Sequence, residues 1–82
     1  MKRVTVYSRP GCHLCAEAIE SIVAMHGEGY RFKLVEVDID SDDSLLRRML
    51  ERIPVVEVDG EVVSELILDG AAVRARLDTV GP

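Results

Sequence analysis

Two cysteines, Cys12 and Cys15, lie three positions apart and are the only cysteines of the 82-residue chain. A disulfide between positions this close closes a very small loop, so it restricts the unfolded chain little and is a poor structural crosslink. The same spacing suits thiol–disulfide exchange, in which one thiolate attacks a substrate disulfide and a second thiol resolves the mixed disulfide. We therefore predict that the pair has a chemical role and not an architectural one.

The pair lies where a predicted strand passes into a predicted helix. Residues 2–7 alternate in the manner of a β-strand, and Pro10-Gly11 ends it. Residues 12–26 then follow a helical period. We predict that the buried face of this helix comprises Leu14, Ala18, Ile19, Ile22 and Met25.

The start of this helix indicates which cysteine reacts. Cys12 falls at the helix N-terminus, where unpaired backbone N–H groups and the helix dipole favour an anion, here a thiolate. Cys15 lies one turn further along the same face, close enough to close a disulfide. We predict that Cys12 is the catalytic nucleophile, that Cys15 is the resolving thiol, and that the two form a redox-active disulfide. We expect no catalytic role for His13 or His26.

Five further elements follow along the chain. They are a strand over residues 31–39, a short helix after the capping oxygens of residues 41–44, strands over residues 55–58 and 61–64, and a helix over residues 71–79. Asp59-Gly60 between two β-branched runs predicts a hairpin. We expect the two helices to pack through Leu45, Leu46, Met49, Leu50, Ala72, Val73 and Leu77.

This order of elements, β-α-β-α-β-β-α, restricts the topology. A strand–helix–strand start gives a parallel pair with a right-handed crossover, and the closing hairpin adds an antiparallel pair. We predict an α/β fold in which one mixed four-stranded sheet carries helices on both faces. The chain is short enough for a single domain over residues 1–82.

The charge and hydropathy of the chain exclude several partners. Ten Lys and Arg against fifteen Asp and Glu give a net charge of −5. An acidic chain without a basic run attracts phosphates poorly, so we expect binding to neither nucleic acid nor an anionic membrane. No apolar stretch approaches the roughly 20 residues of a membrane span, and the N-terminal segment is too polar for a signal peptide. We expect a cytoplasmic monomer.

Metal binding is the main alternative use of a Cys-x-x-Cys pair. A closed zinc site needs four ligands, and the chain has no second cysteine pair. His13 lies inside the motif and His26 lies several helical turns away, so neither completes a tetrahedron with both cysteines, and we expect no structural metal. A metal or iron–sulfur carrier that uses the two thiolates, and a non-catalytic adaptor that uses the same groove for docking, stay open as alternatives.

Three motifs carry a resemblance to the thioredoxin superfamily, and within it to glutaredoxin-like proteins of a Cys-His-Leu-Cys subgroup. They are the segments Val6-Tyr7-Ser8-Arg9-Pro10-Gly11-Cys12-His13-Leu14-Cys15, Val37-Asp38-Ile39-Asp40, and Ile53-Pro54-Val55-Val56 with Asp59-Gly60. The resemblance covers essentially the whole chain and implies a thioredoxin-like fold. It also implies that Pro54 is cis and lies against the cysteines, that the backbone of Ile53 contacts substrate, and that Arg9 pairs with a carboxylate of glutathione.

Two departures from the glutaredoxin pattern bear on the substrate. His13-Leu14 replaces the usual Pro-Tyr between the cysteines, and residues 64–68 replace a Gly-Gly stretch, which adds Glu65 where it would repel a carboxylate-bearing ligand. We predict a glutaredoxin-like dithiol–disulfide oxidoreductase that reduces a disulfide in a protein or a small molecule. It needs no bound cofactor, and its electrons come from glutathione or a thioredoxin-type reductase.

Overall fold

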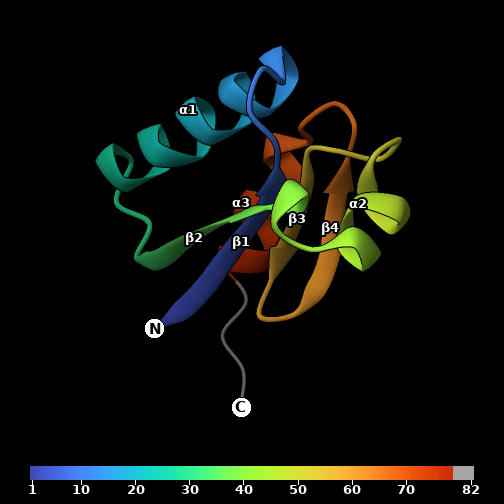
Figure 1. Cartoon of the computed structure of the whole chain (residues 1–82). Coiled ribbons are helices and arrows are strands. Elements are labelled where there is room, and N and C mark those ends of the chain that lie inside the picture. The colour runs from blue at the N-terminus through green and yellow to red at the C-terminus, as the bar shows by residue number, and fades with distance from the viewer. Residues whose placement is uncertain (79–82) are drawn as a thin grey trace.

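The computed structural model describes residues 1–78 and contains the predicted elements in the predicted order (Figure 1). The predicted elements are β1 (Lys2–Ser8), α1 (His13–Gly27), β2 (Phe32–Asp38), α2 (Asp43–Met49), β3 (Val55–Val58), β4 (Glu61–Glu65) and α3 (Gly70–Asp78). A 3-10 turn that was not predicted, η1 (Ile39–Ser41), lies between β2 and α2. Thr79, the expected end of the last helix, lies outside the described residues.

The four strands form one mixed sheet in the order β2-β1-β3-β4. The β1 strand pairs in parallel with β2, with Lys2 opposite Phe32, and antiparallel with β3, with Val6 opposite Val56. The β3 and β4 strands form the antiparallel hairpin that the Asp59-Gly60 turn predicts. The carboxyl end of β1 and the amino end of β3 therefore meet at one edge of the sheet, where α1 begins (Figure 1).

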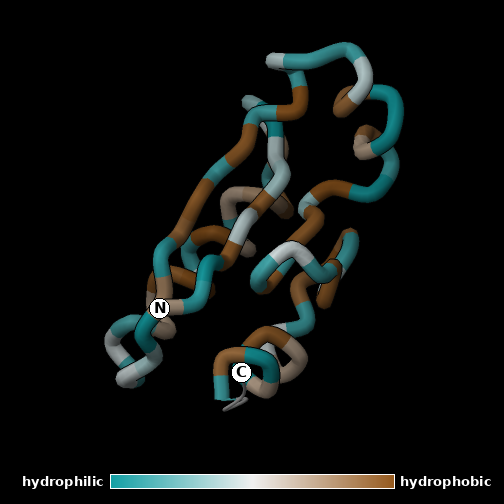
Figure 2. Tube along the Cα trace, turned by 90° about the horizontal axis from the view of Figure 1, so that it is seen from below, coloured by the Kyte–Doolittle hydropathy of each residue, from teal (hydrophilic) through white to brown (hydrophobic). Residues whose placement is uncertain are grey.

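Alternation along β1 and β3 divides the core into two layers, one on each face of the sheet. Figure 2 shows apolar and polar residues alternating along the strands. The first layer packs α1 and α3 on the sheet and consists of Val4, Val6, Ile22, Met25, Phe32, Val56, Val58 and Val73. The second packs α2 on the opposite face and consists of Cys15, Ile39, Met49, Ile53 and Val55. Helices on both faces are thus confirmed, and both cysteines contact the second layer.

Three details of the sequence prediction are wrong. Leu14 is 47% exposed because the buried face of α1 runs through Cys15, Ala18, Ile22 and Met25, and Leu14 precedes that face by one residue. Leu50 is exposed because it is the C-cap of α2 and lies beyond the helix's packed turn. Ile39 is buried but belongs to η1, because the Asp38 carboxylate accepts the Asp40 N–H at 2.8 Å and turns the chain out of β2.

No helix among residues 1–78 combines the length and the apolar character that crossing a lipid bilayer requires.

Candidate active site

A tight turn connects β1 to α1 and sets the direction in which the cysteines enter the structure. The Cys12 N–H donates to the Arg9 carbonyl at 3.2 Å, which closes the turn. Pro10 and Gly11 occupy its centre, and Gly11 has a φ of +80°. A proline followed by a residue at positive φ is the pattern of a type II turn, where glycine adopts the second central position without strain.

The sulfur of Cys12 caps the first turn of α1. Cys12 is the N-cap residue, and its Sγ accepts a hydrogen bond from the Cys15 N–H at 3.1 Å. The two cysteines form a disulfide, with their Cα atoms 5.2 Å apart. In the reduced pair, we expect the same backbone N–H and the positive end of the α1 dipole to favour a thiolate at Cys12.

The two cysteines differ in their exposure to solvent. Cys15 is 2% exposed and packs among Ile39, Ile53 and Val55, whereas Cys12 is half-buried at the edge of that layer. Cys12 is therefore the more accessible of the two cysteines, and Cys15 is reached only through the protein interior.

This geometry predicts that Cys12 reacts with alkylating agents at a lower pH than a free cysteine does. With the pair reduced, we expect iodoacetamide to alkylate Cys12 with a pH midpoint clearly below that of a free cysteine, about 8.5. Mass spectrometry would check this midpoint by measuring the alkylation rate at a series of pH values from about 5 to about 10. The matched control is the same protein unfolded in urea, in which the hydrogen bond and the helix dipole are lost. Equal midpoints in the folded and unfolded protein would contradict the prediction.

The segment before β3 lies against the cysteine pair, as the resemblance implies. The Ile53–Pro54 peptide bond is cis, Pro54 is fully buried, and Ile53 packs in the same layer as Cys15. The Ile53 N–H donates to the Met49 carbonyl at 3.0 Å. The Ile53 carbonyl, in contrast, has no hydrogen-bond partner among residues 1–78. A backbone contact from substrate to Ile53 is therefore restricted to this acceptor.

Two arginines beside the site, Arg9 and Arg52, are paired with carboxylates. Arg9 Nε lies 3.3 Å from Asp40 Oδ1, so its charge is directed toward η1. Arg52 donates to both carboxylate oxygens of Glu65, at 3.1 and 3.0 Å. These hydrogen bonds lower the pKa of the Glu65 carboxyl. Glu65 thus forms an ion pair with Arg52, a partner that the sequence did not reveal, and this pairing reduces the repulsion expected from the Glu65 charge.

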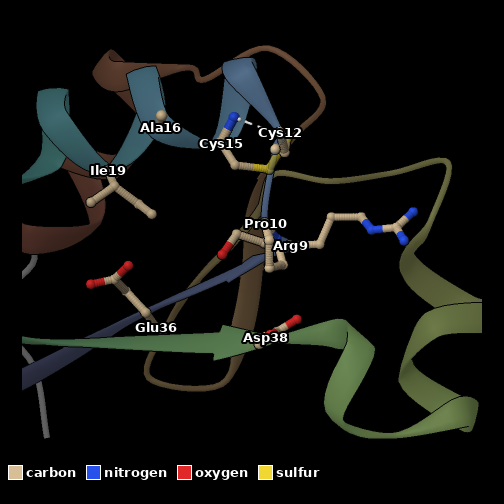
Figure 3. Close-up of a pocket in the computed structure, with 10 residues that line it drawn as sticks. Arg9, Pro10, Cys12, Cys15, Ala16, Ile19, Glu36 and Asp38 are labelled. Atoms are coloured by element: carbon tan, nitrogen blue, oxygen red, sulfur yellow. Dashed lines mark hydrogen bonds between the residues drawn. A yellow bond between two sulfur atoms is a disulfide. The ribbon is translucent and has the colours of Figure 1, made fainter.

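A cavity of about 360 Å³ opens beside the disulfide, between the start of α1 and the end of β2 (Figure 3). Its lining includes both cysteines, Arg9, Glu36 and Asp38. The sequence analysis did not single out Glu36. The alternation of side chains along β2 could have indicated it. The positions of β2 that face α1 change from apolar Phe32 to charged residues toward the carboxyl end of the strand.

The two histidines lie outside this arrangement. His13 is exposed at the start of α1. His26 stacks on the Phe32 ring with centroids 4.0 Å apart, and its Nε2 lies 3.1 Å from the Phe32 carbonyl oxygen, at the opposite end of α1. Across the part of the chain that the structure describes, no three His, Cys, Asp or Glu side chains gather in a group that could hold a metal ion.

The fold and the position of the cysteine pair define a class of protein. The structure is similar to the oxidised thioredoxin from Plasmodium falciparum, with a TM-score of 0.61 over 94% of this chain and 78% of that chain. The identity between the two is 14%, so this likeness shows the fold alone: the chain has a thioredoxin-like fold.

The family is shown by closer comparisons. The profile of the family described as Glutaredoxin-like domain (DUF836) matches residues 3–78, and the chain belongs to this family. Protein Ne2328 from Nitrosomonas europaea is 30% identical, with a TM-score of 0.81 over 94% of this chain and 92% of that chain. Protein XcR50 from X. campestris is also 30% identical, with a TM-score of 0.69 over 95% of this chain and 99% of that chain. No curated protein matches the chain.

Proposed function

We propose that the protein is a dithiol–disulfide oxidoreductase in which Cys12 is the nucleophile and Cys15 the resolving thiol. One observation carries the proposal: a half-buried cysteine whose sulfur caps a helix N-terminus is disulfide-bonded to a second cysteine that is 2% exposed. A helix N-terminus favours the thiolate, which is the nucleophilic form of cysteine. Membership of the glutaredoxin-like family supports the same reaction class.

The reaction balances over two exchange steps. The Cys12 thiolate attacks one sulfur of a substrate disulfide; a Cys12–substrate S–S bond forms, the substrate S–S bond breaks, and the released thiolate takes a proton from water. Cys15 then loses its proton and attacks Cys12 Sγ. The Cys12–Cys15 disulfide forms and the second substrate thiolate leaves and is protonated. The substrate gains two electrons, and the protein dithiol loses two.

The reducing equivalents must come back from another thiol. Glutathione or a thioredoxin-type reductase would return two electrons to the Cys12–Cys15 disulfide by the reverse exchange. Because the two sulfurs carry the electrons themselves, the proposed reaction needs no resident cofactor. We propose a cytoplasmic monomer, because the cytoplasm keeps thiol donors of this kind reduced and the exchange reaction uses the sulfurs of a single chain.

Replacing Cys15 by serine tests the order of the two steps. We expect the Cys15→Ser variant to attack a small symmetrical disulfide and to stop there, because the serine hydroxyl does not displace the bound thiol. Intact-protein mass spectrometry should show one covalent adduct per chain, on Cys12, that dithiothreitol removes. Reduced native protein should show no lasting adduct, and the variant with both cysteines replaced should show none. An adduct on native protein as stable as that on the variant would contradict the assignment of Cys15.

The same proteins discriminate the alternative functions. A metal or iron–sulfur carrier would bind its metal with the native pair and lose it in either single variant, without forming the mixed disulfide. A docking adaptor would require neither cysteine, and its Cys12 would be alkylated like a free thiol, with a midpoint near about pH 8.5.

A further inference from the structure

An exposed apolar surface adjoins the cysteine pair and has no role in the exchange reaction described above. Leu14 is 47%, Leu66 50% and Ile67 76% exposed. Leu14 lies between the two cysteines in sequence, and Leu66 and Ile67 belong to the loop from β4 to α3. The Leu66 N–H donates to the Arg52 carbonyl at 2.9 Å, so this loop also borders the Ile53–Pro54 segment. We refer to Leu14, Leu66 and Ile67 as the apolar rim.

The rim surrounds a hollow between α1 and the β4–α3 loop. Its volume is about 180 Å³, and it is lined by Leu14, Glu17, Ala18, Ser21, Leu66, Ile67 and Leu68. An apolar protein cavity of about 150 Å³ holds a benzene molecule. The hollow is therefore large enough to receive one aliphatic or aromatic side chain of a partner.

The loop that exposes these side chains is held in place by specific hydrogen bonds. The Ser64 hydroxyl accepts the Asp69 N–H at 2.9 Å and donates to the Ile67 carbonyl at 3.4 Å. Leu66 has a φ of +62°, a left-handed conformation that costs free energy for a leucine. The fold thus keeps the side chains of Leu66 and Ile67 in contact with water near the disulfide, with Leu66 in a strained backbone conformation.

The charges around the site select between kinds of substrate. Two nearby arginines already face a carboxylate, Arg9 that of Asp40 and Arg52 that of Glu65, so part of the positive charge beside the site is compensated within the protein. The start of α3 is also occupied, because the Asp69 carboxylate accepts the Ala72 N–H at 3.0 Å. Glu17, which lines the hollow, has no ion-pair partner among residues 1–78. The surroundings therefore complement an apolar, cationic ligand and disfavour one rich in carboxylates.

We propose that the substrate is a disulfide in a polypeptide segment whose cysteine has an apolar neighbour and a nearby lysine or arginine. The apolar side chain enters the hollow, the cation pairs with Glu17, and a backbone N–H of the segment donates to the Ile53 carbonyl. Oxidised glutathione carries several carboxylates and no large apolar side chain, so it fits this surface poorly. This inference rests on the proposed function, since the chemistry is the exchange at Cys12.

The test compares matched disulfide probes with fully reduced protein in single turnover. Three probes are disulfide-linked dimers of short capped peptides. In the first, leucine flanks the cysteine and a lysine follows; in the second, alanine replaces leucine; in the third, glutamate replaces lysine. Oxidised glutathione and uncharged hydroxyethyl disulfide complete the set. We expect the leucine peptide to react at least about tenfold faster than the alanine peptide, and oxidised glutathione to be slower than both peptides that carry lysine.

Two variants locate the preference on the surface. Ile67→Ser should lower the leucine-to-alanine rate ratio toward one, while the control Val62→Ser, an exposed apolar residue of β4 outside the rim, should leave the ratio unchanged. Glu17→Gln should reduce the advantage of lysine over glutamate, and this effect should weaken at high salt. Equal rates for leucine and alanine peptides, or an unchanged ratio in Ile67→Ser, would overturn the inference. Failure of the native protein to reduce hydroxyethyl disulfide would instead overturn the proposed function.

Discussion

Replacing Cys12 by serine is expected to abolish disulfide reduction, with a loss on the order of a thousandfold or more in turnover. The serine hydroxyl does not ionise near neutral pH and forms no bond to sulfur that Cys15 can resolve. Cys15 does not substitute for the missing nucleophile, because it is 2% exposed and packed against Ile53 and Ile39. The assay is reduction of hydroxyethyl disulfide, with the thiol product followed continuously.

The fold of this variant should survive, which makes the result interpretable. Serine is a preferred N-cap residue, and its hydroxyl oxygen can accept the Cys15 N–H that Cys12 Sγ accepts now. The unfolding midpoint of Cys12→Ser should therefore match that of the reduced native protein within experimental error. Full dithiol activity in Cys12→Ser, in a variant that is shown to be folded, would falsify the assignment of the nucleophile.

Replacing Ile22 by alanine is expected to produce the largest loss of stability among the single changes considered. Ile22 is fully buried in the layer that packs α1 and α3 on the sheet. Truncating a buried isoleucine to alanine costs about 2–5 kcal/mol, through lost transfer free energy and the cavity left behind. A domain of this length has a typical unfolding free energy of roughly 4–12 kcal/mol. The substitution should therefore remove a large fraction of the unfolding free energy of the protein.

The neighbouring residue supplies a matched control. Val23 is 48% exposed on the opposite side of α1, so Val23→Ala removes little buried surface and places a better helix former at that position. Its unfolding free energy should lie within about 0.5 kcal/mol of the native value. Urea unfolding of the native protein, Ile22→Ala and Val23→Ala, each with its disulfide intact, would measure these free energies. The comparison is valid when the three proteins have the same m-value. Similar midpoints for Ile22→Ala and Val23→Ala would show that the packing on this face is not as described.

Most of the fold could be predicted from the sequence because each element carries its own local signal. The alternation in residues 2–7, the turn at Asp59-Gly60 and the capping oxygen of Asp42 each depend on a few adjacent residues, and the structure contains all three features. A strand–helix–strand unit then has one preferred handedness, which extends the local signals to a topology. The order of the seven main elements followed from these rules.

The errors occur where a local pattern does not define a boundary or a face. Leu14 fits a helical period as well as Cys15 does, and only the position of the sheet decides that Cys15 points inward and Leu14 outward. Leu50 continues the apolar pattern of α2 for one residue after the packed turn has ended. In both cases burial depends on a second element that is distant in sequence.

The sequence by itself determined that a cysteine pair with exchange spacing stands at the junction of a strand and a helix. Both facts rest on neighbours within one helical turn, whose geometry the chain covalently constrains. Only the tertiary structure decided that Cys15 is buried against Ile53 while Cys12 stays accessible, and that Arg9 and Arg52 form ion pairs with Asp40 and Glu65. It also decided that Leu14 meets Leu66 and Ile67 in one exposed rim. These contacts join residues far apart along the chain, and their formation depends on how the helices pack on a sheet whose register spans residues 2–65.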